Sequence, residues 1–214
     1  MFNEQIRSWG NNFSCSASEY SCSSVSLAAE IVRSYALQGI IPRGAGRSYG
    51  DQSLNSGGGL LSLQRSEDLN SYVVTDSGLV NVNGESAIGD LLSAVIPQGW
   101  LLPVVPGSES ITIGGALAAD AHGKNHFHQS SLASCCKEMN VMIADGSIIH
   151  CSTETERDLF WATVGGLGLT GLIISATLQL QKITGSSLEV NTKSFSRFSY
   201  LFEGLKIALS LIHI

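Results

Sequence analysis

Basic residues and long hydrophobic runs are both scarce in this sequence. Lysine and arginine together number 12 against 18 aspartates and glutamates, giving a net charge of −6. Without a basic stripe that could release counterions, this balance argues against a nucleic-acid partner. No apolar run approaches the ~20 residues that a membrane span needs, and MFNEQIRSWGNN lacks the hydrophobic segment of a secretory signal. We expect a cytoplasmic protein, or one attached at most peripherally to the inner membrane.

Two nucleotide-binding signatures and the usual zinc signature are also missing. No GK[ST] occurs, which excludes a P-loop, and Gly44-x-Gly46-x-x-x-Gly50 misses the Rossmann spacing by one residue. The 5 cysteines show no paired C-x-x-C spacing, so we interpret them as reduced thiols and expect no zinc ribbon. A metal site remains an alternative for a cluster of four residues: Asp120, His122, His126 and His128. This alternative is disfavoured because no thiolates support it.

A glycine-rich loop between two short apolar runs is the main feature of the sequence. It occupies Ile40–Leu63, with glycines at positions 44, 46 and 50 and again at 57–59. Glycine permits backbone angles that let successive N–H groups point the same way and form a concave anion site. Arg47 adds a planar, permanently charged fork suited to phosphate. The loop predicts binding of a phosphorylated ligand, with an ordinary glycine-rich connection as the alternative.

Hydrophobic periodicity predicts helices alternating with short strands up to residue 183. The chain is expected to end without a closing structure, with a solvated connection over 194–203. The final LSLIHI can be the translation of a transposon end used in sequencing libraries, with a genuine short helix as the alternative. The predicted helices span 24–37, 86–96, a small-residue segment after Gly114, and 156–164; the predicted strands span 40–41, 60–63, 72–75, 79–82, 100–105, 139–143, 148–151 and 172–183.

Four stretches resemble one family in order, spacing and identity. They are PRGAGRSYGD (42–51), PGSESITIGGALAADAHGKNH (106–126), MNVMIADGSI (139–148) and LFWATVGGLGLTGLI (159–173). They are similar to the PCMH-type FAD-binding domain of the vanillyl-alcohol-oxidase superfamily. Within it, HGKNH and FWATVGGLGLTG resemble the decaprenylphosphoryl-β-D-ribose oxidase family, as does Trp9-Gly10 near the N-terminus.

The resemblance implies an α+β fold of two subdomains that clasp the cofactor. The FAD-binding domain would span 6–183, with subdomains at about 15–65 and 66–183. Residues 184–214 would begin a substrate domain that this chain truncates, its last residues being artefactual. Too few residues follow 183 to build such a domain.

The resemblance also implies the residues of the site. Tyr49 and His122 would lie beside the flavin, and Lys124 would bind substrate phosphate; a core or capping role is the alternative for His122. Relatives with covalent flavin carry a histidine where Arg47 stands, so FAD should bind non-covalently. The implied FAD-contacting residues are Pro42, Arg43, Gly44, Ala45, Gly46, Arg47, Ser48, Tyr49, Gly50, Asp51, Gln52, Gly107, Thr112, Ile113, Gly114, Gly115, Ala119, His122, Gly123, Lys124, Asn125 and Leu172.

The implied activity is oxidation of the 2'-hydroxyl of a polyprenyl-phosphate-linked ribose to a keto sugar, by hydride transfer to flavin N5. An epimerising reductase is the implied protein partner. Two alternatives stay open at this stage. One is a sugar-alcohol or aldonolactone oxidase of the same superfamily, and the other is an inactive FAD-binding fragment.

Overall fold

The computed structural model describes residues 5–35, 39–65, 72–187, 190 and 192–211, with side chains up to residue 205. Helices and strands are mixed throughout, which confirms the expected α+β class. The strands are β1 (Ile6–Arg7), β2 (Ser14–Cys15), β3 (Ser18–Cys22), β4 (Ile40–Pro42), β5 (Gly59–Leu63), β6 (Leu79–Asn83), β7 (Trp100–Leu101), β8 (Cys136–Met142), β9 (Ile148–Ser152), β10 (Leu172–Gln179) and β11 (Gln181–Lys182). The helices are α1 (Val25–Ser34), α2 (Ile88–Val95), α3 (Ile113–Ala118), α4 (His126–Gln129), α5 (Arg157–Thr163) and α6 (Phe198–Leu211).

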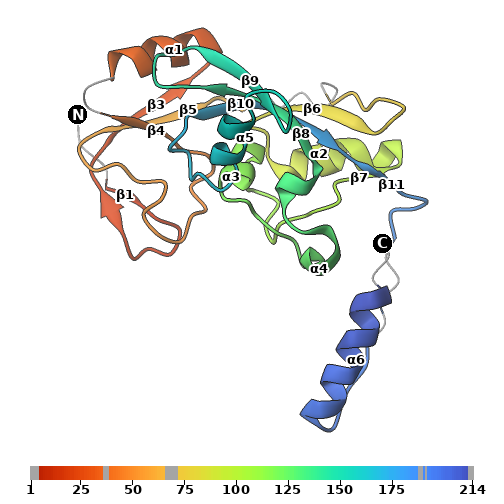
Figure 1. Ribbon diagram of the computed structural model, residues 1–214. Helices are drawn as coiled ribbons and strands as arrows, with labels where there is room; N and C mark the ends of the chain where they lie inside the picture. The colour runs from red at the N-terminus through yellow and green to blue at the C-terminus, as the bar shows by residue number, and fades with distance from the viewer. Residues whose placement is uncertain (1–4, 36–38, 66–71, 188–189, 191, 212–214) are drawn as a thin grey trace.

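Two sheets carry the fold (Figure 1). The first is parallel, with the order β3-β5-β4, and the second is antiparallel, with the order β6-β10-β8-β9. Strands β4 and β5 flank the glycine-rich loop, so this loop is the connection between two neighbouring parallel strands. The first sheet comes from residues 18–63 and the second from 79–179. The predicted domain and subdomain boundaries stay predictions.

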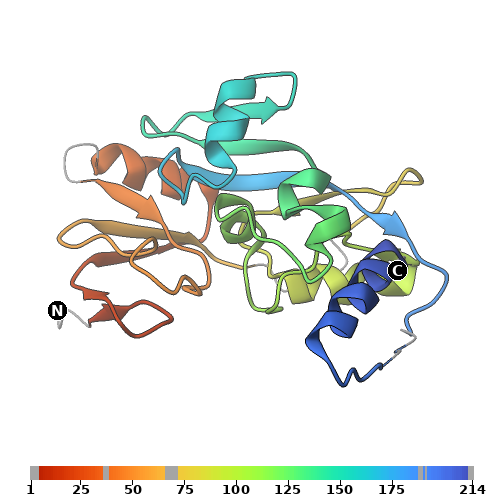
Figure 2. The same cartoon turned by 60° about the horizontal axis from the view of Figure 1, so that its bottom comes forward.

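Helix α1 covers the parallel sheet (Figure 1, Figure 2). Ser24 caps its N-terminus, with Oγ accepting a hydrogen bond from the Leu27 N–H at 3.2 Å. Its buried residues Ala28 and Val32 pack in one cluster with Leu61 of β5. The helix was predicted over 24–37, and positions 36–37 lie outside the described residues.

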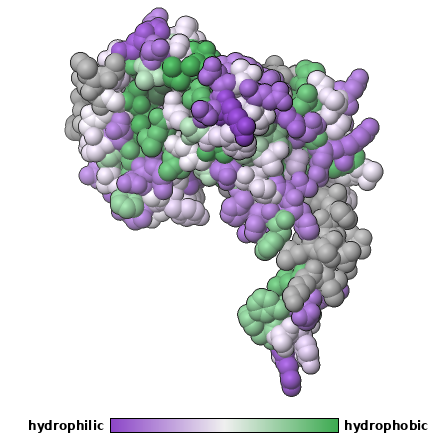
Figure 3. Space-filling model, viewed as in Figure 1, coloured by the Kyte–Doolittle hydropathy of each residue, from purple (hydrophilic) through white to green (hydrophobic). Residues whose placement is uncertain are grey.

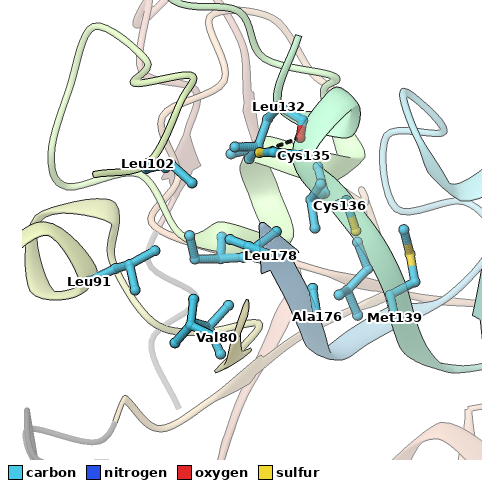
Figure 4. Packing of buried hydrophobic residues seen from close by; sticks show 14 of the residues in the cluster. Val80, Leu91, Leu102, Leu132, Cys135, Cys136, Met139, Ala176 and Leu178 are labelled. Atoms are coloured by element: carbon cyan, nitrogen blue, oxygen red, sulfur yellow. Dashed lines mark hydrogen bonds between the residues drawn. The ribbon is translucent and has the colours of Figure 1, made fainter. Parts of the chain in front are cut away.

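The larger core lies between the antiparallel sheet and helices α2, α3 and α5. Figure 4 shows Leu178 of β10 among Val80, Leu91 and Leu102, with Cys135 and Leu132 joined by a hydrogen bond from Sγ to the carbonyl at 3.1 Å. Such a core of fully buried aliphatic side chains supplies most of the free energy that favours folding.

Residues 172–183 alternate in hydrophobicity, and β10 corrects what this alternation predicts. The pattern predicts a single strand with these residues on one face: Leu172, Ile174, Ala176, Leu178 and Leu180. The register shifts between Ile173 and Ser175, which marks a β-bulge. A bulge adds one residue and reverses which side chains face each way. Leu172 and Ile174 therefore pack towards the α1 cluster, whereas Ile173 and Leu178 belong to the large core. The predicted strand also ends at Gln179, and β11 pairs separately with β7.

The solvated connection expected over 194–203 is wrong from residue 198, where helix α6 begins. Residues 198–211 contain no proline, a single glycine and several strong helix formers, which favours a helix. In Figure 1 this helix projects away from the two sheets, and hydrophobic atoms mark part of it in Figure 3. Its exposed side chains include Phe198, Phe202 and Leu205. The transposon interpretation of LSLIHI stays a prediction, and residues 212–214 lie outside the described residues.

Among the described residues, no helix is both long enough and apolar enough to cross a membrane.

All 5 cysteines are free and buried, and their environment gives a testable protection pattern. Burial raises the pKa of Cys135 and Cys136 to about 12 and that of Cys151 to about 11. At about pH 8 the reactive thiolate of Cys135 should then be roughly a thousandfold rarer than in an exposed cysteine. We expect a chromogenic thiol reagent to titrate these three only after denaturation. Rapid labelling of the native protein, mapped to any of them by mass spectrometry, would contradict this packing.

Candidate functional site

A cavity of about 340 Å³ lies where the glycine loop meets α3 and the start of β10. The walls come from residues 42–53, 62–65, 84–87, 110–119 and 167–173, so the cavity exists only after both sheets have formed. The lining residues are Pro42, Arg43, Gly44, Ala45, Ser48, Gln52, Ser53, Ser62, Leu63, Arg65, Gly84, Glu85, Ala87, Ser110, Thr112, Gly114, Gly115, Ala118, Ala119, Leu167, Gly168, Gly171, Leu172 and Ile173.

The glycine loop is held in place by its carbonyl groups and by one arginine. Arg43 Nη1 donates to both the carbonyl oxygen and Oγ of Ser53, each at 2.9 Å. The Ser48 carbonyl accepts from Trp9 N–H at 2.9 Å, and the Asp51 carbonyl accepts from Leu54 N–H at 2.8 Å. The Arg43 guanidinium therefore fixes the loop and is already occupied by protein acceptors.

In contrast to the carbonyl groups, the backbone N–H groups of the same loop from Gly44 to Ser53 have no hydrogen-bond partner in the described part of the protein. Gly46 adopts φ +64°, the left-handed conformation that lets neighbouring amides converge. Arg43 N–H is the exception at the loop entrance, because it donates to the Leu61 carbonyl at 2.8 Å. Five residues of this run line the cavity, so their unpaired amides are candidates to bind an anion there: Gly44, Ala45, Ser48, Gln52 and Ser53.

The first N–H groups of α3 are hydrogen-bonded within the protein. The N–H groups of Ile113 and Gly114 donate to the carbonyls of Ser86 and Gly84, both at 2.8 Å. The Gly115 N–H donates to Oγ1 of the capping Thr112 at 3.2 Å. These amides are satisfied by protein, so α3 contributes its surface to the cavity and not its first N–H groups.

That surface is made of very small residues. Gly114, Gly115 and Ala119 line the cavity together with Gly168 from the loop before β10. A methyl group on Gly114 would meet the Gly84 carbonyl oxygen at 3.1 Å, so this glycine also allows close backbone packing. The resulting wall can accept a flat ring without steric conflict.

One wall of the cavity carries charged groups. Arg65 forms an ion pair with Asp90 of α2. Glu85 lies in the turn between β6 and α2, and its Oε2 atom is buried without a hydrogen-bond partner. Burial raises the pKa of the Glu85 carboxyl, an effect that its own backbone amide partly offsets.

The three predicted catalytic residues are exposed, and none of them lines the cavity. Tyr49 is 74% exposed. His122 Nδ1 lies 3.2 Å from the Gly123 carbonyl oxygen, and its ring centroid lies 5.2 Å from that of His126. Asn125, also predicted, donates from Nδ2 to the Pro103 carbonyl at 2.9 Å, which fixes the segment that carries Lys124. Their catalytic roles stay predictions.

Arg47 also lies outside the cavity lining. Its guanidinium carbon stacks 3.9 Å from the centre of the Trp9 ring, and its Nε is buried without a partner. The other predicted residues outside the lining are Gly46, Tyr49, Gly50, Asp51, Gly107, Ile113, His122, Gly123, Lys124 and Asn125. The predicted residues that line it are Pro42, Arg43, Gly44, Ala45, Ser48, Gln52, Thr112, Gly114, Gly115, Ala119 and Leu172.

Sequence reasoning missed several cavity residues. Those that fall in the recognised stretches 106–126 and 159–173, and could have been proposed from them, are Ser110, Ala118, Leu167, Gly168, Gly171 and Ile173. No recognised stretch contains the others, which are Ser53, Ser62, Leu63, Arg65, Gly84, Glu85 and Ala87. Among the described residues, no three His, Cys, Asp or Glu side chains gather as they would around a metal ion.

Comparison with known proteins places this geometry in context. Residues 21–152 match the family described as "FAD binding domain". The chain is 37% identical over 183 residues to decaprenylphosphoryl-beta-D-ribose oxidase of Mycolicibacterium smegmatis, covering 83% of this chain and 39% of that protein. It is 30% identical over 144 residues to cytokinin dehydrogenase 7 of Oryza sativa, covering 66% of this chain and 28% of that protein. The chain thus spans less than two fifths of either relative's length.

Proposed function

Because the chain belongs to the FAD binding domain family, we propose that its cavity holds FAD and that the protein oxidises a secondary alcohol. The observation that carries the proposal is the run of unpaired amides from Gly44 to Ser53 beside the cavity. A pyrophosphate needs several converging donors, and backbone N–H groups supply them without a counter-ion.

The remaining walls fit the other parts of the same ligand. The small residues Gly114, Gly115, Ala118 and Ala119 leave space for a flat isoalloxazine ring. Arg43 contributes indirectly, because its bonds to Ser53 hold the loop with its amides free. The residues present therefore suit the cofactor in both charge and shape.

We propose that the substrate is bound by the exposed side chains of Tyr49, His122 and Lys124, which lie outside the cavity lining. FAD, when bound, supplies the acceptor for the hydride. A proton on His122 Nδ1 would be donated to the Gly123 carbonyl at 3.2 Å, leaving Nε2 as the acceptor for the hydroxyl proton, with Tyr49 as the second candidate. The ammonium group of Lys124 is suited to a substrate phosphate.

The substrate class we propose is a ribose linked to polyprenyl phosphate, oxidised at its 2'-hydroxyl. Support comes from the 37% identity to the mycolicibacterial oxidase, whose name specifies a decaprenylphosphoryl ribose. A lipid-linked substrate suits peripheral attachment to the inner membrane, and an epimerising reductase would use the keto product. The test is steady-state turnover with the polyprenylphosphoryl ribose against alditols and aldonolactones. Preferential turnover of an alditol or lactone would contradict this assignment.

We propose that FAD is bound without a covalent bond. The residues that line the cavity include no histidine, cysteine or tyrosine that could attach to the flavin, and Arg47 stacks on Trp9 outside it. We therefore expect protein loaded with FAD to release all its flavin into the supernatant on acid precipitation, measured by absorbance. Flavin that remains in the washed pellet would contradict non-covalent binding.

A further inference from the structure

Glu85 is a charged residue of the cavity lining to which the proposed function assigns no role. Its Oε2 atom is buried and has no hydrogen-bond partner, although it lies in the wall of a cavity. The cation on the same wall does not compensate it, because Arg65 is paired with Asp90. Tyr72, the other titratable group near this corner, has its own pKa raised mainly by burial.

Leaving a carboxylate oxygen buried and unpaired costs free energy that the fold alone does not recover. Burial raises the pKa of Glu85, so the folded protein disfavours its ionised form. Native proteins satisfy nearly all buried polar groups, and exceptions at a cavity point to a ligand. Glu85 lies in the cavity lining together with Gly84 and Ala87, whose side chains are absent or small.

The chemistry of a carboxylate narrows what this ligand group can be. An ionised carboxylate only accepts hydrogen bonds, and it repels phosphate. The phosphate groups of the ligand would instead bind the unpaired amides from Gly44 to Ser53, which belong to a different part of the chain from Glu85. Glu85 should therefore face a neutral part of the ligand that carries hydroxyl donors.

Resting on the proposed function, we infer that Glu85 is a recognition residue that accepts a hydrogen bond from a sugar hydroxyl of the bound flavin dinucleotide. FAD carries such hydroxyls on the ribose of its adenosine half and on the ribityl chain of its flavin half. The two sources share one chemistry, and half-ligands separate them.

The experiment measures binding of FAD, ADP and FMN to the wild-type chain and to Glu85→Ala by titration calorimetry. We expect Glu85→Ala to weaken FAD binding roughly tenfold to a hundredfold, as for loss of a hydrogen bond to a charged group. Weakening of ADP but not FMN assigns the adenosine ribose, and the reverse assigns the ribityl chain. Glu154→Gln, an exposed glutamate outside the cavity lining, is the matched control and should bind FAD as wild type does.

The stability of the ligand-free protein separates recognition from a structural role. A carboxyl whose pKa is raised on folding stabilises the protein at low pH, and this contribution is lost as the pH rises through the folded-state pKa. Neutral Glu85→Gln should therefore be at least as stable as wild type at about pH 7.5, while binding FAD more weakly. A structural glutamate would give the opposite result, a lower melting temperature.

Three outcomes would overturn the inference. An unchanged FAD affinity in Glu85→Ala would overturn this inference and leave the proposed function standing. An equal loss of affinity for ADP and FMN would also overturn it, because such a loss indicates general damage to the site. A fall in the melting temperature of Glu85→Gln would also overturn it. If the wild-type chain failed to bind FAD, the proposed function would be contradicted, and this inference, which rests on it, would fall as well.

Discussion

Gly46→Val is expected to weaken FAD binding by about a hundredfold, as measured by quenching of flavin fluorescence. Gly46 has φ +64°, where a β-branched residue is strained by roughly 1–3 kcal/mol. A side chain there would also meet Nη2 of Arg43 at 2.7 Å and displace the guanidinium that holds Ser53. Both effects disturb the unpaired amides that we propose bind the pyrophosphate.

Gly57→Val is the matched control in the same connection between β4 and β5. Gly57 also has a positive φ, +78°, but it lies outside the run of unpaired amides and outside the cavity lining. An added carbon there would have nothing within 4 Å. We expect its FAD affinity to stay within about threefold of wild type. Equal affinities for the Gly46 and Gly57 variants would mean that the loop is only a connection.

Gly84→Ala should lower the free energy of unfolding by about 3 kcal/mol, combining overpacking with lost backbone hydrogen bonds. A methyl group at this position would collide with the carbonyl oxygen of Ile173, which cannot move independently of β10. Gly84 N–H also donates to the Ile174 carbonyl and its own carbonyl accepts from Gly114, each at 2.8 Å. Displacing residue 84 would therefore loosen β10 and α3 together.

Urea denaturation of the ligand-free protein measures this effect, with Gly107→Ala as its control. Gly107 is exposed, and an added carbon there would have nothing within 4 Å. We expect its free energy of unfolding to stay within about 0.5 kcal/mol of wild type. A Gly84→Ala variant as stable as Gly107→Ala would show that the close approach of Gly84 to β10 is wrong.

The sequence by itself determined the features that depend on short, local patterns. Helices α1, α2 and α5 follow from apolar residues at helical spacing. The glycine loop was identified because its conformation requires glycine at Gly46, and glycine is visible in a sequence. The four recognised stretches led to the family that the comparison then showed. Each of these signals lies within a few consecutive residues, so no folding had to be known.

Only the tertiary structure decided which groups of these segments are still free to bind a ligand. The amides of α3 are satisfied by Gly84 and Ser86, and the Arg43 guanidinium by Ser53, whereas the loop amides remain unpaired. The β10 bulge turns Leu172 and Ile174 towards α1, and the turn after β6 brings Glu85 into the cavity. Hydrogen bonds and burial between segments far apart in the chain depend on how the two sheets pack, and no local pattern records them.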